Sequence, residues 1–259
     1  MRYLYVGTKR EIYVPIMGLI VGELIMFYGY VLYGLYMHMI NVLIMVLLIT
    51  FSSSELRTKN ILQSIILLTL LRMINLLMPQ FFTVTILQYL LVYGTMFIPI
   101  YSIIKSQKIS SEELGINLSG AYIYVPAAII IGALMATVEY GIMIPISIVE
   151  KVSFSDIVFM TVVMFVFVGT VEEVIFRSIF QTRIEKMFGS RYGILLSGGI
   201  FGIMHASYGI LNGVLFASMF GIVVAYIFHK TKNVLFVISI RGTADVMLFG
   251  IIPYMLARF

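Results

Sequence analysis

The stretch from residue 157 to residue 187 reads IVFMTVVMFVFVGTVEEVIFRSIFQTRIEKM, and it decides how this chain folds. A helix that crosses a lipid bilayer needs about 20 mainly apolar residues, and this stretch is long enough. Near its middle, Glu172 and Glu173 stand side by side, and Arg177 follows one helical turn after Glu173. An ionisable residue at bilayer depth costs at least about 2.5 to 3.5 kcal/mol, so such residues usually line a polar site or neutralise one another.

The charges of Glu172, Glu173 and Arg177 cannot all cancel, because these are two carboxylates and one guanidinium. Helix positions four apart share a face, whereas neighbouring positions diverge by about 100°. We therefore expect Glu173 to pair with Arg177, while Glu172 points in another direction. A partly desolvated carboxylate beside an ion pair can act as a base. The same residues would also suit a structural polar contact between helices, and this alternative stays open.

The composition of the whole chain indicates a membrane protein. Of its 259 residues, 61% are hydrophobic and only 11% are charged, whereas soluble domains carry about 25% charged residues. The absence of cysteine excludes disulfides and thiol chemistry. The net charge is +5, but the basic residues are dispersed through short loops, so membrane lipids and not nucleic acid are the expected partners.

The predicted fold class is all-α, a polytopic transmembrane helical bundle of about eight or nine spans. The predicted helices cover residues 12–33, 37–53, 61–78, 82–104, 121–147, 157–187, 192–207, 209–228 and 233–256. With nine spans and a cytoplasmic N-terminus, most Lys and Arg residues would lie inside and only Lys151 and Arg258 outside, as the positive-inside rule requires. The predicted location is therefore the cell membrane, with several passes. His38 is expected near the outer surface.

One polar connection divides the predicted helices into two parts. It runs from Lys105 to Gly120, and we expect a short helix within it at Ser110–Gly115, closed by Gly115. The predicted organisation is a group of N-terminal transmembrane helices of unassigned role at 1–104, a cytoplasmic loop at 105–120 and a C-terminal domain at 121–259. The C-terminal domain holds most of the unusual charged residues.

Ionisable residues of three predicted helices fall at similar depths in the bilayer. Counting about 1.5 Å per residue from the inner interface places Glu172, His205, Arg241 and Asp245 far from the surface. The small residues of 198–202 allow close helix packing. We therefore expect the C-terminal helices to form a polar cavity. A histidine beside a carboxylate can polarise a water for attack on a carbonyl, and N–H donors can stabilise the oxyanion that results.

Three motifs follow one another in the C-terminal part of the chain. They are Glu172-Glu173-x-x-x-Arg177, then Phe201-x-x-x-His205, and then a polar pair four residues apart, Arg241 and Asp245. In this order and at these spacings the chain resembles the type II CAAX prenyl endopeptidases, also called CPBP intramembrane proteases. The resemblance covers roughly residues 121–259.

The resemblance implies roles for the residues of these motifs. Glu172 would be the general base that activates water, and Glu173 with Arg177 would organise the helix. His205 would assist the water, and the last motif would supply donors for the oxyanion. The substrate would be a peptide or a lipidated protein.

The last motif departs from the family pattern, which has His followed four residues later by Asn or Asp. Arg241 takes the place of this His and precedes Asp245. Arginine can donate to an oxyanion but cannot bind a metal. The resemblance allows a divalent metal, but Glu172 or Glu173, His205 and Asp245 make a thin ligand set, so no metal or other cofactor is assigned. Arg241 could also pair with Asp245, or with Glu172, which would weaken that carboxylate as a base.

The sequence thus predicts an intramembrane endopeptidase that hydrolyses peptide bonds near the membrane surface with water activated by Glu172 and His205. The alternative is an inactive relative that binds membrane proteins or lipidated peptides as a chaperone or immunity factor. A third interpretation, a transporter, is disfavoured because no internal repeat is found. The other charges within spans, Glu23, Arg72 and Glu139, are interpreted as interhelical pairs or interface positions.

Overall fold

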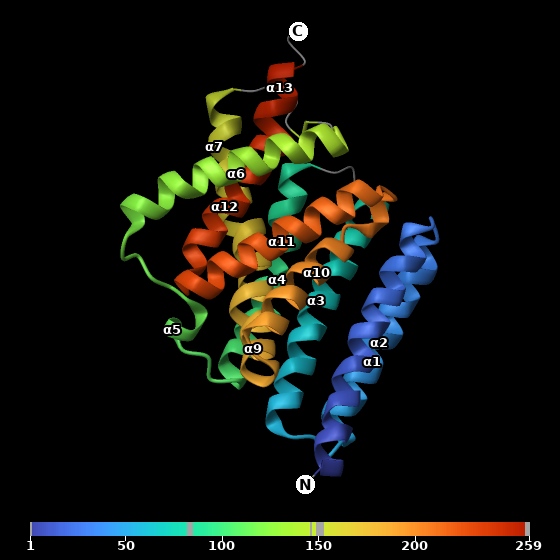
Figure 1. Ribbon diagram of the computed structural model, residues 1–259. Helices are drawn as coiled ribbons and strands as arrows, with labels where there is room; N and C mark the ends of the chain where they lie inside the picture. Colours follow the sequence, from blue (N-terminus) through green and yellow to red (C-terminus); the bar gives the residue numbers. More distant parts are fainter. Residues whose placement is uncertain (1, 82–84, 146, 149–152, 257–259) are drawn as a thin grey trace. The chain divides into compact units, whose positions relative to one another are not determined.

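The protein folds into helices joined by short connections (Figure 1). The computed structural model describes residues 2–81, 85–145, 147–148 and 153–256. These ranges contain no β-strand, so the predicted all-α fold is confirmed.

Seven helical stretches of the described residues are long and apolar enough to cross a membrane, and the chain is an integral, multi-pass membrane protein. The seven stretches are Val31–Phe51, Leu56–Leu77, Ile86–Ser106, Ala121–Met143, Phe154–Phe188, Leu211–Thr231 and Val234–Leu256. The predicted spans at 12–33 and 192–207 correspond to α1 (Arg2–Phe27) and α10 (Ser190–Ile203), which are not among the seven. Helix α1 carries several charged residues, and α10 has only 14 residues, fewer than the ~20 that a span needs.

The chain divides into two compact units. Unit 1 consists of Met1–Leu76 and Ile179–Ala225, and unit 2 consists of Leu77–Ser178 and Tyr226–Phe259. This division describes packing. The functional division at residues 105–120 stays a prediction.

Unit 1 contains the N-terminal helices and the segment around residue 200. Its elements are α1, α2 (Val31–Phe51), most of α3 (Leu56–Phe81), α9 (Thr182–Phe188), α10, the 3-10 helix η3 (Ala206–Tyr208) and most of α11 (Leu211–Thr231). Gly29, with a φ of 92°, allows the tight turn between α1 and α2. The two helices lie side by side, and a Cβ on Gly22 of α1 would lie 3.0 Å from the His38 ring of α2.

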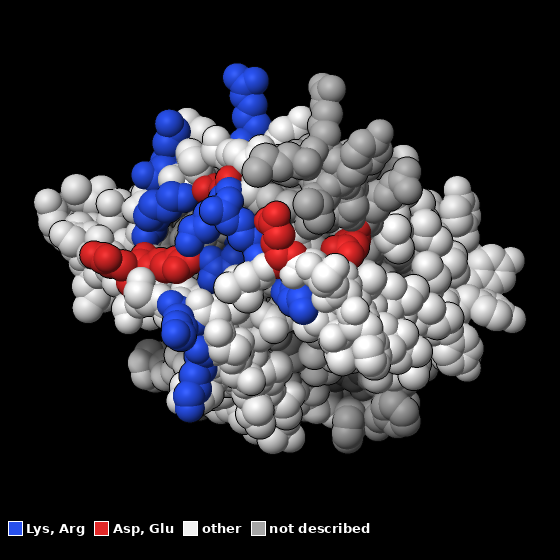
Figure 2. All heavy atoms as spheres, turned by 90° about the horizontal axis from the view of Figure 1, so that it is seen from below, with Lys and Arg blue, Asp and Glu red and all other residues white. Residues whose placement is uncertain are grey.

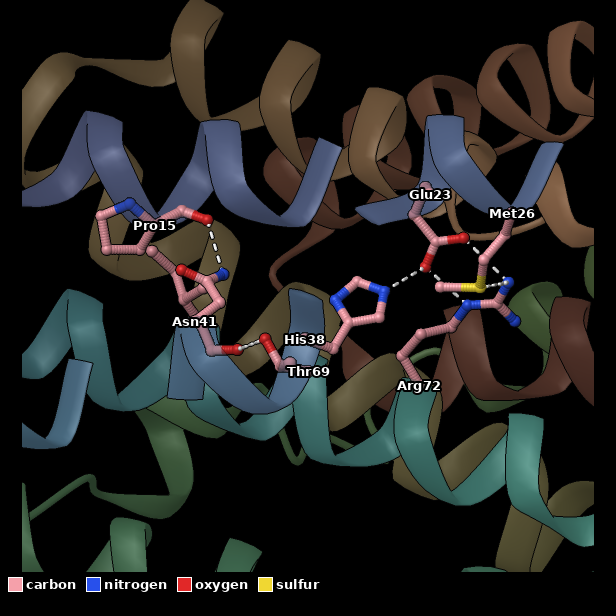
Figure 3. Close-up of polar contacts among 8 residues, drawn as sticks. Pro15, Glu23, Met26, His38, Asn41, Thr69 and Arg72 are labelled. Atoms are coloured by element: carbon pink, nitrogen blue, oxygen red, sulfur yellow. Dashed lines mark hydrogen bonds and ion pairs between the residues drawn. The ribbon is translucent and has the colours of Figure 1, made fainter. Parts of the chain in front are cut away.

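A buried polar cluster joins α1, α2 and α3 (Figure 3). Arg72 of α3 donates from Nε and Nη2 to the two carboxylate oxygens of Glu23, at 2.6 and 2.8 Å. The Nε2 atom of His38 lies 3.2 Å from Glu23 Oε1, and both side chains are fully buried. The sequence left an interhelical pair or an interface position open for Glu23 and Arg72, and the structure shows an interhelical pair. The expectation that His38 lies near the outer surface is wrong, because α2 begins at Val31 and turns this histidine toward α1.

Small residues bring α10 and α11 into close contact. A Cβ on Gly198 would meet Ile222, and one on Gly202 would meet Ser218. The small-residue face predicted for this helix therefore does pack against a neighbouring helix. Gly199 takes no part, since nothing lies within 4 Å of its Cβ position.

Unit 2 contains the greater part of the long helix that carries Glu172 and Glu173. Its elements are the end of α3, α4 (Ile86–Ser106), α5 (Ser111–Leu114), α6 (Ala121–Met143), α7 (Phe154–Val162), the π-helix η1 (Val163–Gly169), α8 (Thr170–Glu173), most of the π-helix η2 (Val174–Gln181), the end of α11, α12 (Val234–Val246), the π-helix η4 (Met247–Ile251) and α13 (Ile252–Leu256). Elements α7 to α9 continue one another as the stretch Phe154–Phe188.

The predicted short helix in the polar connection is confirmed as α5. The Ser110 side chain accepts a hydrogen bond from Glu113 N at 3.1 Å, which caps its start. Gly115 closes α5 with a φ of 81°. The Gly115 carbonyl then accepts a hydrogen bond from Val234 N at 2.8 Å, so this connection is fixed against the start of α12.

Exposed lysines of unit 2 collect where this connection meets the turn between α11 and α12. They are Lys105, Lys108, Lys230 and Lys232. The Asn233 amide in the same turn donates to Asn117 O at 2.9 Å, which holds the two loops together. Figure 2 shows lysine and arginine side chains in blue, with acidic side chains among them. A basic end of this kind is what the positive-inside rule expects of a cytoplasmic face.

Helix α12 packs closely on two neighbours because the contacts use glycine. A Cβ on Gly132 of α6 would lie 2.6 Å from Ile240 O and 2.8 Å from Thr243 Cβ. Gly242 of α12 lies against the Phe165 ring of η1 in the same way. These contacts hold Arg241 next to the helix that carries Glu172.

Candidate active site

Glu173 and Arg177 form the ion pair that their spacing predicted. Arg177 Nε donates to Glu173 Oε2 at 2.9 Å, and neither side chain is more than 1% exposed. At the next residue, the Ser178 hydroxyl donates to Leu114 O at 2.6 Å, which ties the same helix to α5. Both charges are therefore buried together, and each neutralises the other.

Glu172 points away from that pair, as expected for its neighbouring helix position. The Tyr93 hydroxyl of α4 donates to Glu172 Oε1 at 2.9 Å. On the other side, Arg241 Nε of α12 lies 2.9 Å from Glu172 Oε2. Glu172 is 7% exposed and Tyr93 is 3% exposed. The carboxylate is thus buried and contacted through both oxygens, by a neutral donor and by a cation.

Arg241 is shared between two carboxylates. Its Nε atom also lies 3.3 Å from Asp245 Oδ2, so both pairings that the sequence allowed are present together. Neither contact has the alignment of a hydrogen bond, and the attraction is Coulombic. Glu139 of α6 adds a third carboxylate that interacts electrostatically with Arg241 and Glu172.

The site lies between irregular helical segments. The π-helices η1 and η2 directly precede and follow α8, which ends with Glu172 and Glu173. The Thr170 hydroxyl donates to Phe165 O, five residues earlier, at 3.0 Å, in keeping with the wider π-helical turn. A third π-helix, η4, begins two residues after Asp245. Such π-helical turns are rare and occur frequently at functional sites.

Formal charges in this cluster do not cancel. The carboxylates of Glu139, Glu172, Glu173 and Asp245 outnumber the guanidiniums of Arg177 and Arg241. An uncompensated charge in a buried site is costly, so the cluster favours holding a proton or binding a positively charged or hydrogen-donating group. An arrangement of this kind can accept a proton from a bound water.

His205 lies in unit 1, whereas the other predicted site residues lie in unit 2. Helix α10 ends at Ile203, so this histidine is on a turn and not inside the predicted helix. Its Nδ1 atom lies 2.8 Å from Phe201 O, and its ring contacts those of Phe201 and Tyr208 at centroid distances of 5.0 and 6.2 Å. The backbone contact through Nδ1 leaves Nε2 as the nitrogen directed away from the helix end.

The residues of the cluster do not suit a divalent metal. Among the described residues, no three His, Cys, Asp or Glu side chains are placed to hold one. The carboxylates of Glu172 and Asp245, which would be candidate ligands, instead flank the permanently cationic Arg241. No step of the chemistry proposed below passes through a metal.

Sequence reasoning missed two residues of the cluster. Tyr93 is one of 17 tyrosines in the chain, and no local pattern distinguishes it from the others. Glu139 was interpreted as part of an interhelical pair or as an interface position. The apolar residues around Glu139 could have identified it as a site residue, because a carboxylate inside a span is a candidate for function by default.

The comparison with protein families found a match in the C-terminal part of the chain. Residues 154–247 match the family model described as Type II CAAX prenyl endopeptidase Rce1-like. Neither the curated proteins nor the solved structures gave a match. The matched segment contains all six residues that the motifs singled out. The family predicted from the motifs is therefore confirmed, and residues 154–247 of this chain form a domain of the Rce1-like type II CAAX prenyl endopeptidase family.

Proposed function

We propose that this protein is an intramembrane endopeptidase of the CAAX-protease type, which hydrolyses peptide bonds near the membrane surface. One observation carries the proposal. Within the family-matched segment, the buried carboxylate of Glu172 is held by Tyr93 on one oxygen and faces Arg241 with the other. A carboxylate fixed in this way beside a cationic donor has the parts that water-mediated acyl hydrolysis needs.

In the proposed reaction, Glu172 removes a proton from a water molecule. The water oxygen attacks the carbonyl carbon of the scissile peptide, and the carbonyl oxygen becomes an oxyanion. The bond from carbon to nitrogen then breaks, and the proton held by Glu172 passes to the leaving amine. The products are a free carboxylate and a free amine. The base contributes about 10²- to 10⁴-fold to the rate of such a step.

The other site residues have supporting roles in this proposal. Arg241 donates N–H groups to the oxyanion, and Asp245 holds the guanidinium in place. Glu173 and Arg177 keep the helix in register, so that Glu172 faces the substrate. His205 is proposed to assist the water, on the basis of the motif resemblance alone.

The substrate class follows from the family and from the membrane. The family is named for prenylated proteins, and we propose a peptide or lipidated protein whose cleavage site lies near the bilayer surface. We also propose that the chain lies in the cell membrane with a cytoplasmic N-terminus. Four crossings by α1 to α4 would place the N-terminus on the same side as the exposed lysines of the 105–120 connection and of the turn between α11 and α12, which supports this orientation.

The proposal is tested with purified, detergent-solubilised protein and a quenched library of lipidated peptides. Native protein and Glu172→Gln are compared, each with and without a chelator. The matched control is Glu112→Gln, which removes an exposed carboxylate of α5. We expect cleavage by the native protein and the control in both buffers, and loss of cleavage in Glu172→Gln. Full cleavage by Glu172→Gln would contradict the assignment of the base.

A second candidate function is favoured by the contact of Arg241 with Glu172 at 2.9 Å. A cation paired with the base weakens it, and a relative without turnover could still bind lipidated peptides or membrane proteins as a chaperone or immunity factor. This candidate predicts binding that survives Glu172→Gln, together with no cleavage by the native chain. Cleavage that appears only in Arg241→His would show that Arg241 had converted a protease site to binding.

A further inference from the structure

Tyr93 contacts the proposed base from a helix outside the family-matched segment. It belongs to α4, whereas the family match begins at residue 154. Its hydroxyl lies 2.9 Å from Glu172 Oε1, and the side chain is 3% exposed. The N-terminal helices, to which no role was assigned, thus supply a direct contact to the site within unit 2.

The position of Tyr93 is set by packing on the helix that carries Glu172. In α4 the buried residues are Tyr93, Met96 and Ile100, which form one stripe at helical spacing. Next to this stripe, the Phe167 ring of η1 lies 3.7 Å from the Cβ position of Gly94 and edge-on to Phe97, at a centroid distance of 6.0 Å. Phe167 lies five residues before Glu172 on the same helix, so its contact with α4 fixes the two helices close to the site. This packing directs the Tyr93 hydroxyl at the carboxylate of Glu172.

An aromatic ring of the same helix packs on Tyr93. Tyr89, one turn earlier, stacks on it at a centroid distance of 6.0 Å and an interplanar angle of 21°. Stacked rings restrict the rotation of the phenol. The hydroxyl is therefore a preorganised donor and not a mobile one.

The hydrogen bond from Tyr93 affects Glu172 differently from the contact with Arg241. A phenol is neutral, so it orients the carboxylate without adding a positive charge beside it. An ionised carboxylate has about four acceptor positions. It can accept from Tyr93 and still accept a proton from water. With Tyr93 on Oε1 and Arg241 beside Oε2, rotation of the carboxylate is restrained.

We propose that Tyr93 is a positioning residue that fixes Glu172 in the orientation needed to take a proton from water. This inference rests on the proposed peptidase function. It gives α4 a part in the reaction, and it makes the active site larger than the family-matched segment.

The test compares Tyr93→Phe with Tyr101→Phe in the peptide-cleavage assay. Both variants remove one hydroxyl from α4, but Tyr101 is 65% exposed and does not belong to the buried stripe. A hydrogen bond to a charged group is lost in Tyr93→Phe, and we expect kcat to fall about 10- to 100-fold with KM unchanged. Tyr101→Phe should keep the native kcat. In a Glu172→Gln background, Tyr93→Phe should cause no further loss.

An infrared measurement tests the same contact without turnover. The difference spectrum between native protein and Tyr93→Phe should contain a shifted carboxyl band. This band should be absent from the corresponding difference in the Glu172→Gln background. A missing band would overturn the inference, because the hydroxyl would then not bind this carboxylate.

The outcomes separate the inference from the function on which it rests. Native cleavage that depends on Glu172, together with an unchanged kcat in Tyr93→Phe, would overturn the role of Tyr93 alone. A rise in KM with kcat unchanged would also overturn it, since that pattern indicates loss of substrate binding. No native cleavage in any condition would contradict the proposed function and the inference together.

Discussion

Adjacent glutamates at positions 172 and 173 have different surroundings because they lie on different faces of one helix. Glu173 is neutralised four residues on by Arg177, whereas Glu172 faces Tyr93 and Arg241 from two other helices. The Glu173–Arg177 contact is local, so sequence spacing predicted it in full. The contacts of Glu172 come from residues far away along the chain, and the sequence indicated only that Arg241 was one available partner.

Removing one member of the Glu173–Arg177 pair should be strongly destabilising. Glu173→Gln leaves a buried guanidinium without its carboxylate, and we expect a loss of about 3 to 5 kcal/mol in the free energy of unfolding. The double variant Glu173→Gln/Arg177→Met removes both charges and should recover most of that loss. Unfolding of the purified protein, followed by denaturant titration in detergent, measures the difference. Equal losses of stability in the single and double variants would show that the charges of Glu173 and Arg177 do not neutralise each other.

At the scale of helices, the apolar stretches and the small residues predicted where helices lie and pack. They did not predict exactly where each helix begins and ends. The long apolar stretches gave the correct positions of the helices, and the glycines of 198–202 marked a true packing face. The start of α2 was missed because nothing polar precedes Val31 to signal it, and His38 was misplaced as a result. The π-helical turns η1 and η2 leave no pattern in an apolar sequence and could not be predicted.

Close packing of α6 on α12 should be sensitive to a single methyl group. In Gly132→Ala the new Cβ would lie 2.6 Å from Ile240 O, so the helices must separate and Arg241 must move. We expect a loss of about 1 to 3 kcal/mol in stability, the usual cost of overpacking, together with reduced cleavage. Thermal unfolding and the peptide assay measure the two effects.

Gly141→Ala is the matched control on the same helix. Nothing lies within 4 Å of its Cβ position, so the change should be neutral or slightly stabilising, since alanine favours helix over glycine. If both variants behaved alike, the close contact between α6 and α12 would not be a determinant of stability.

At the scale of the whole molecule, composition predicted the membrane and the motifs predicted the family. The helical bundle and the family match both confirm this. What the sequence could not supply is the contribution of α4 and α6, because Tyr93 and Glu139 are distant from the motifs along the chain. Such long-range contacts depend on packing and have no local signature.

The proposed orientation predicts which loops are reachable from each side of the membrane. The chain has no cysteine, so a single introduced cysteine can be labelled without reaction at any native thiol. Glu112→Cys in the 105–120 connection should react with a membrane-impermeant maleimide only after the membrane is opened. Ser155→Cys, exposed at the start of α7, should react in intact cells. The reverse pattern would show that the 105–120 connection faces outward.

The most direct test of the central claim is the rate of peptide cleavage by the native protein relative to Glu172→Gln, on the best substrate from the lipidated library. A base that takes a proton from water accounts for about 10²- to 10⁴-fold of the rate, so a loss of that size is expected at unchanged folding and in the presence of chelator. Equal rates for the two proteins, or no cleavage by the native one, would contradict the claim that Glu172 is the base of an intramembrane peptidase.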